Sequence, residues 1–201
     1  MFGLHVSRRT AMALVAVGAT AAVAGLTRDD RSPIGDAVPL PREFPVLPPS
    51  RPIRVAIPSI DVRAPIRPVG LAPDGSIAVP PLRRHWEVGW FARSPTPGQY
   101  GPTVLVGHAD TASGPSVFHD LRRLRPRARI EVTRQDRRVA IFEVTSVERF
   151  RRTRLPAERV YADFTRPGLR LITCAGRWVG GGTGYSDNIV VFASLVDSRG
   201  P

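Results

Sequence analysis

Short, β-branched segments bounded by proline and glycine recur from residue 53 onward, and this pattern constrains the fold more than any other feature of the chain. Such segments predict strands, because branched side chains suit an extended backbone and proline or glycine ends it. Parallel strands would need helical crossovers, and helical stretches are almost lacking. We therefore expect an all-β domain, either a sandwich or a barrel. The expected strands cover residues 54–60, 62–71, 76–81, 103–109, 129–134, 139–150, 169–175 and 188–196.

One helix is predicted within residues 115–124, which read PSVFHDLRRL. Val117, Phe118, Leu121 and Leu124 would share one face of this helix, as the apolar residues of a half-buried helix do. The arginines between and after them would then point to solvent.

Residues 11–26, AMALVAVGATAAVAGL, form an uncharged apolar stretch near the N-terminus. A stretch of this length is either a short membrane span or the core of a secretory signal; a buried core helix is the remaining alternative. Arg8 and Arg9 precede it, and the positive-inside rule then places the N-terminus in the cytoplasm. We favour an uncleaved anchor over residues 1–27, with the rest of the chain outside a membrane that it crosses once.

Residues 28–52 contain seven prolines and few large apolar side chains. Such a segment forms neither a helix nor a strand ladder and predicts an extended spacer. The expected organisation is therefore an anchor at 1–27, a linker at 28–52, a barrel or sandwich at 53–197 and a tail at 198–201.

The chain carries a formal net charge of +12, and all 29 of its basic residues are arginine. Chemistry based on a lysine amine is therefore excluded. The arginines are scattered through the expected strands without a recognition helix or an aromatic RNA-binding motif, so nucleic acid is not an expected partner. An anionic surface outside the cell fits the expected topology better, and a solvated basic surface without a specific partner is the alternative.

Cys174, in the segment LITCAG, is the only cysteine of the chain. A lone cysteine makes no internal disulfide, although extracellular proteins usually pair their thiols. It is either a small buried apolar residue or a reactive thiol. Its place beside glycine, at the expected end of an apolar strand, favours the reactive thiol.

A nucleophilic thiol needs a nearby base or cation, and His108 is the best candidate among the four histidines. His108 follows the apolar segment TVLV and Gly107, and Cys174 lies two residues before Gly176. His85 is the second choice, and Asp110 would either orient the imidazole or cap the next turn. Closed zinc sites use four ligands with closely spaced pairs, a spacing that the sequence lacks, so we expect no metal and no other cofactor.

The order of several motifs over residues 53–196 resembles the sortases, in particular the actinobacterial type grouped as class F or E. This resemblance implies a closed eight-stranded β-barrel with one or two short helices, and a cysteine transpeptidase anchored outside the membrane. The motifs that carry it are IPSIDVRAPI, VGLAPDGSIAVPP, GWF, PGQYGPTVLVGHAD, GPSVFHDLRRL, RVY, LRLITCAG and YSDNIVVFA.

Sortases cleave an LPxTG-like sorting signal at the threonine carbonyl and transfer the acyl group to an amine on a cell-wall precursor. The resemblance implies that Cys174 is the nucleophile. It also implies that His108 protonates the leaving amine and then takes a proton from the incoming one. The loops near residues 85–100 and 150–165 would set the sorting motif.

Sortases also place an arginine at the start of the last strand, where this chain has Asn188. An asparagine amide donates a hydrogen bond without charge, and losing a charge-assisted donor costs about 1–2 kcal/mol. Arg177 either supplies the missing charge from the neighbouring segment or is a surface residue. Residues 176–185, rich in glycine, are either a flap over the thiol or a plain connection.

Three functions are compatible with these features. The first is the transpeptidase, and the second is a hydrolase with the same thiol chemistry. The third is a non-catalytic peptide-binding module on the same barrel, which the absent arginine makes plausible. Reaction of Cys174 with a sorting-signal mimic would separate the third from the first two.

Overall fold

The computed structural model describes residues 45–180 and 184–201. The expected anchor at 1–27 lies outside these residues, as does the expected spacer up to residue 44. Within the described part of the chain, no helix has the length and apolar character needed to cross a bilayer.

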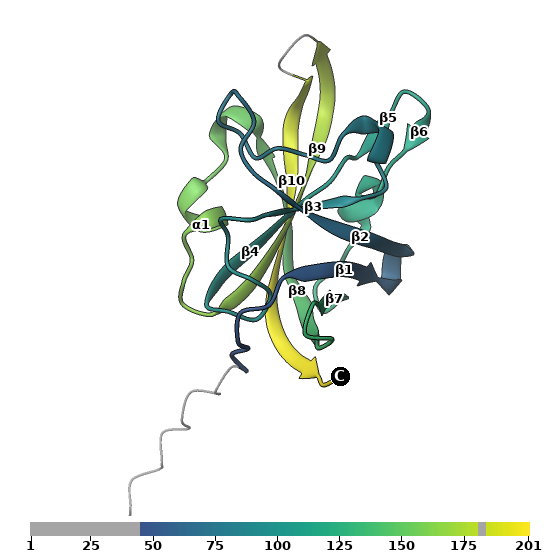
Figure 1. The fold of residues 1–201 in the computed structure, drawn as a ribbon. Helices are drawn as coiled ribbons and strands as arrows, with labels where there is room; N and C mark the ends of the chain where they lie inside the picture. Colours follow the sequence, from purple (N-terminus) through teal and green to yellow (C-terminus); the bar gives the residue numbers. More distant parts are fainter. Residues whose placement is uncertain (1–44, 181–183) are drawn as a thin grey trace, which may run out of the picture. The chain divides into compact units, whose positions relative to one another are not determined.

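Eight strands close into a barrel in the order β1-β2-β3-β4-β9-β10-β8-β7 (Figure 1). This confirms the all-β class and the closed eight-stranded barrel. A separate two-stranded sheet is formed by β5 (Asp110–Thr111) and β6 (Gly114–Pro115). The barrel strands are β1 (Pro52–Ile57), β2 (Val62–Val69), β3 (Val88–Phe91), β4 (Gly101–Val106), β7 (Arg129–Arg134), β8 (Val139–Arg151), β9 (Pro167–Gly180) and β10 (Gly184–Arg199).

Helical structure in the described residues is limited to α1 (Ala157–Tyr161) and four short 3₁₀ turns. In place of the helix expected over 115–124, the structure has a single short 3₁₀ turn at His119–Arg123. Its apolar face is nevertheless confirmed: Phe118, Leu121 and Leu124 are buried in the core. The turns are η1 (Pro58–Ile60), η2 (Leu82–Arg84), η3 (His119–Arg123) and η4 (Arg152–Arg154).

Two strand predictions differ from the structure. Residues 76–81 form a loop with a single bridge between Leu71 and Ile77, since Pro80 and Pro81 have no N–H for a ladder. Conversely, β3 was not expected, because its four residues are too few to show alternation. It pairs in parallel with β2 and antiparallel with β4, and it completes the barrel wall.

Two apolar clusters lie on opposite sides of the barrel wall. Side chains alternate across a strand, so Leu105 of β4 packs in one cluster while Val104 and Val106 pack in the other. The second cluster also holds Val160 of α1, so this short helix covers the outer face of β4. Burial on both faces explains why β4 reads as a continuous apolar run.

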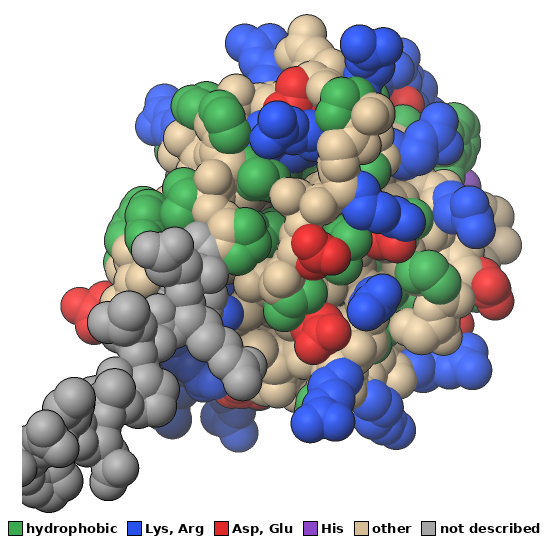
Figure 2. All heavy atoms as spheres, turned by 90° about the horizontal axis from the view of Figure 1, so that it is seen from below, with side chains coloured by type: hydrophobic (Ala, Val, Ile, Leu, Met, Phe, Trp, Pro, Cys, Tyr) green, Lys and Arg blue, Asp and Glu red, His purple; other side chains and the backbone are tan. Residues whose placement is uncertain are grey.

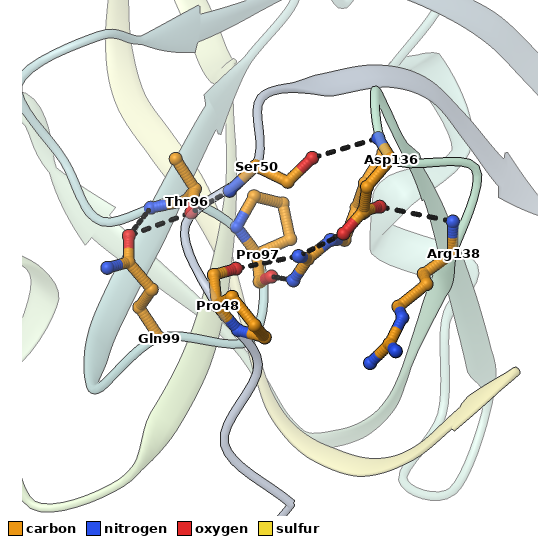
Figure 3. A network of polar contacts seen from close by, with 8 residues as sticks. Pro48, Ser50, Thr96, Pro97, Gln99, Asp136 and Arg138 are labelled. Atoms are coloured by element: carbon orange, nitrogen blue, oxygen red, sulfur yellow. Dashed lines mark hydrogen bonds and ion pairs between the residues drawn. The ribbon is translucent and has the colours of Figure 1, made fainter. Parts of the chain in front are cut away.

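Residues 45–51 pack on the barrel, although they belong to the expected spacer. Leu47 is buried, and its N–H donates to the carbonyl of Gly98 at 2.9 Å. The fully buried guanidinium of Arg134 donates to the carbonyls of Pro48 and Pro97, each at 2.6 Å (Figure 3). The folded domain therefore begins before β1.

Arginine side chains are spread over the face seen in Figure 2, with acidic and apolar side chains between them. Several arginines of the described residues form ion pairs, for example Arg199 with Glu131 at 2.6 Å. On this face the positive charge is therefore distributed over the surface.

Candidate active site

His108 follows β4, and Cys174 lies in the neighbouring strand β9 just past the end of their shared ladder. The parallel ladder between β4 and β9 ends with Val106 opposite Ile172, and each candidate lies two residues further on. The Gly107 N–H donates to the carbonyl of Ile172 at 3.2 Å, which continues the ladder by one step. Thr173 also donates its hydroxyl to the Gly107 carbonyl at 2.8 Å. The register therefore places the imidazole and the thiol on neighbouring backbone positions.

Cys174 lies within β9 and not at its end, which corrects the expectation from the sequence. β9 continues to Gly180 because β10 pairs with it along this whole length. Beyond the end of β4 the two strands project as a ribbon (Figure 1). Residues 176–180 and 184–185, treated above as a flap or a connection, belong to this ribbon; residues 181–183 lie outside the described structure.

Gly176 turns the ribbon just past the thiol, with φ at +88°. A Cβ there would lie 2.3 Å from Ser186 Oγ, whereas a Cβ at Gly180, with φ at +83°, would meet nothing. We expect Gly180→Ala to lower the free energy of local opening of the ribbon by about 1 kcal/mol. Gly176→Ala should lower it by at least about 2 kcal/mol. Hydrogen exchange over the ribbon, read by mass spectrometry, measures both; equal costs would contradict the close contact.

A pocket of about 540 Å³ opens beside Cys174 and is lined mainly by apolar side chains. The loop between β2 and β3 and the segment after β8 supply much of this lining. Sequence reasoning placed the specificity loops at 85–100 and 150–165 but missed the part played by residues 71–79. The lining residues include Leu71, Ile77, Val79, Phe91, Val106, Leu155, Tyr161, Ile172, Thr173, Asn188 and Arg152.

The His108 ring is held by backbone, since its Nε2 lies 2.6 Å from the carbonyl oxygen of Pro80. A carbonyl only accepts hydrogen bonds, so Nε2 carries a proton. Nδ1 is then the ring nitrogen at which a proton can be exchanged. Asp110 does not orient this imidazole; instead it accepts a hydrogen bond from the Tyr185 hydroxyl at 2.6 Å.

The hydrogen bond to Asp110 raises the pKa of Tyr185 to about 12. Because this shift favours the neutral phenol in the folded protein, its contribution to stability is present below pH about 10. It is lost as the pH rises through about 12. We expect the tyrosinate absorbance of the wild type minus that of Tyr185→Phe to titrate with a midpoint near that pH. A midpoint near the ordinary tyrosine pKa would contradict the hydrogen bond to Asp110.

Asn188 and Arg177, the two residues expected to bind the substrate or the oxyanion, lie in different surroundings. Asn188 is directly opposite Cys174 in the β9–β10 register and lines the pocket. Arg177 is exposed on the ribbon, where its backbone N–H donates to Ser186 Oγ at 3.1 Å. The arginine that lines the pocket is Arg152, at the start of η4, which the sequence did not single out.

Burial raises the pKa of the Cys174 thiol, while the positive charge of Arg152 lowers it and the Asp110 carboxylate raises it. Since the net direction is upward, the thiol needs a proton acceptor before it can react as a thiolate. His85 is placed elsewhere, with its Nδ1 3.2 Å from Ser116 Oγ. The described residues hold no cluster of three or more potential metal ligands.

Comparison with known proteins agrees with this architecture. A family model of the sortase domain matches residues 55–196. No curated protein sequence gives a significant match. The fold is similar to sortase A from Corynebacterium diphtheriae, with 22% identity, a TM-score of 0.55, and 77% of this chain but only 62% of that chain aligned.

Two further solved structures share the fold. For sortase C-1 from Actinomyces oris the identity is 23% and the TM-score 0.55, over 72% of this chain and 73% of that chain. For the sortase D5 transpeptidase of Clostridium perfringens the identity is 16% and the TM-score 0.53, over 73% of this chain and 79% of that chain. The family model reaches into all eight barrel strands and includes Cys174 and His108, and the chain therefore belongs to the sortase family.

Proposed function

We propose that this sortase is an extracytoplasmic cysteine transpeptidase of the actinobacterial class F or E type. It cleaves an LPxTG-like sorting signal through a thioester on Cys174 and transfers the acyl group to an amine on a cell-wall precursor. The family consists of cysteine transpeptidases. The observation that supports the proposal is the β4–β9 register, which ends two residues before both His108 and Cys174, together with the apolar pocket that Cys174 lines.

The Cys174 thiol first gives its proton to Nδ1 of His108. The thiolate then attacks the threonine carbonyl carbon, and the carbonyl oxygen becomes an oxyanion. The C–N bond then breaks, and His108 gives a proton to the leaving amine. An incoming amine attacks the thioester, His108 takes its proton, and the C–S bond breaks to restore the thiolate. The Asn188 amide, opposite the thiol, donates to the oxyanion.

The apolar pocket provides room for the leucine and proline of the signal. Residues 1–27 anchor the chain in the membrane, so the pocket faces secreted proteins on the outer side. The arginine-rich surface of the domain suits the acidic polymers and headgroups found there.

Intact-mass analysis of the full-length chain in mild detergent tests this proposal. The chain is incubated with an LPxTG peptide library, with and without triglycine or diaminopimelate, beside Cys174→Ala. We expect an acyl adduct that requires Cys174 and that the amine converts to a ligated peptide. An adduct resolved equally by water would indicate a hydrolase. A folded protein that forms no adduct would support the non-catalytic peptide-binding module.

A further inference from the structure

The first half of β10, beside the thiol, carries no arginine. Asn188 is opposite Cys174, and the residue before it is the acidic Asp187. That carboxylate accepts from Arg149 Nε at 2.6 Å, so Arg149 is engaged in an ion pair. Positive charge at the thiol must therefore come from another element.

The strand register identifies that element. Asn188 pairs with Cys174 of β9 on one side and with Phe150 of β8 on the other, so these three side chains share a face of the sheet. Arg152 lies two residues past Phe150, where β8 gives way to η4, and its side chain lines the same pocket as Cys174 and Asn188. Two strand spacings, about 10 Å between backbones, separate Phe150 from Cys174. A long arginine side chain spans this distance.

Arg152 and Cys174 line the same pocket of about 540 Å³. Within residues 45–180 and 184–201, Arg152 is the one charged side chain of that lining. Its Nη2 also lies 3.8 Å from Oδ2 of Asp74, in the loop between β2 and β3. The guanidinium is thus positioned between the loop and the thiol, with 38% of its side chain exposed.

The charged and titratable groups around the thiol come from four elements. The positive charge of Arg152 acts to lower the thiol pKa, against burial and the Asp110 carboxylate. Tyr185 of β10 donates to Asp110, and His108 follows β4. An arginine keeps its charge at any working pH, so Arg152 acts whatever the protonation of His108.

We propose that Arg152 stabilises negative charge at Cys174, first on the thiolate and then on the oxyanion of the tetrahedral intermediate, in place of an arginine on β10. The guanidinium fork suits both tasks, because fixed N–H donors in a partly dry pocket stabilise developing charge strongly. Asp74 holds the fork at the mouth of the pocket. The oxyanion step rests on the proposed transpeptidase function, whereas the thiolate step stands without it.

Thiol alkylation tests the thiolate step without any sorting signal. The thiolate displaces iodide from iodoacetamide, forming a C–S bond, so the rate reports the thiolate fraction. We expect Arg152→Gln in the full-length chain to slow alkylation at pH 7 about three- to tenfold and to move the pH profile to higher pH. Arg152→Lys should keep part of the rate, and Arg154→Gln, the same charge change in η4, should alkylate as the wild type does.

Two results would overturn the proposal. One is an Arg152→Gln protein with wild-type circular dichroism and an unchanged alkylation profile. The other is slower alkylation in Arg177→Gln with an unchanged rate in Arg152→Gln. That result would show that Arg177, on the ribbon, stabilises the thiolate.

Acyl transfer tests the oxyanion step. With a peptide that the wild type ligates, Arg152→Gln should lower kcat about tenfold or more and change KM less, because the oxyanion exists only along the reaction path. An unchanged kcat would remove the oxyanion role. If none of the tested peptides acylates the wild-type protein, the transpeptidase proposal fails. The alkylation profile still decides whether Arg152 supports the thiolate.

Discussion

Replacing His108 with glutamine is expected to lower kcat/KM for acyl transfer by about 10²–10⁴-fold. The glutamine amide can still donate to the Pro80 carbonyl that now holds Nε2, so the loop contact is retained. It cannot exchange a proton with the leaving or incoming amine. The loss is measured with the ligated peptide and amine found for the wild type.

His85→Gln is the matched control for this experiment, because His85 sits in a different pocket, against Ser116 and Trp86. It should keep near wild-type turnover. Alkylation of Cys174 at high pH, where the thiolate forms without help, should be similar in both variants and shows that the site is folded. Retained turnover in His108→Gln, or its loss in His85→Gln alone, would mean that the acid–base residue has been misassigned.

Replacing Arg134 with methionine is expected to lower the free energy of unfolding by about 3–5 kcal/mol. The Arg134 side chain has no exposed surface and donates to two backbone carbonyls and to Asp136 Oδ2, each at 2.6 Å (Figure 3). Methionine fills similar space but leaves the carbonyls of Pro48 and Pro97 without this donor. Urea unfolding of the full-length chain measures the change.

The same network makes this loss depend on pH. The hydrogen bond from Arg134 lowers the pKa of Asp136. A lowered pKa in the folded state contributes stability above the unfolded value of about 4, and this contribution is lost as the pH falls below it. The difference between wild type and Arg134→Met should therefore shrink in acid.

Arg138→Met provides the comparison for Arg134→Met. Asp136 Oδ1 accepts from the backbone N–H of Arg138 at 3.1 Å, and that donor survives the change of an exposed side chain. Arg138→Met should change the free energy of unfolding by no more than about 0.5 kcal/mol. Similar losses in the two variants would show that the buried guanidinium contributes little.

Local patterns predicted much of the barrel. The strand at 129–134 matches β7 at both ends, because alternation and flanking turn residues mark it clearly. The continuous apolar runs around His108 and Cys174 indicated the two strands that meet at the site. The family resemblance then supplied the closed barrel and assigned the two residues their roles, which remain predictions.

What the sequence could not predict depends on long-range pairing. Gly176 looked like a strand end, but β10 supplies partners that carry β9 on to Gly180. The position of Arg152 depends on the register of β8 against β10, which no local pattern encodes. Leu47 looked like part of a spacer because its partner, Gly98, is distant in sequence.

The loop between β2 and β3 contacts both the His108 imidazole and the Arg152 guanidinium. The Pro80 carbonyl accepts from His108, and Asp74 forms an ion pair with Arg152. The same loop supplies Leu71, Ile77 and Val79 to the pocket wall. Under the proposed function, engineering this loop for a new sorting motif would alter His108, the proposed proton carrier, and the Arg152 guanidinium together with the pocket wall. Selectivity and turnover would change jointly, so libraries for retargeting should hold Asp74 and Pro80 fixed while the apolar positions vary.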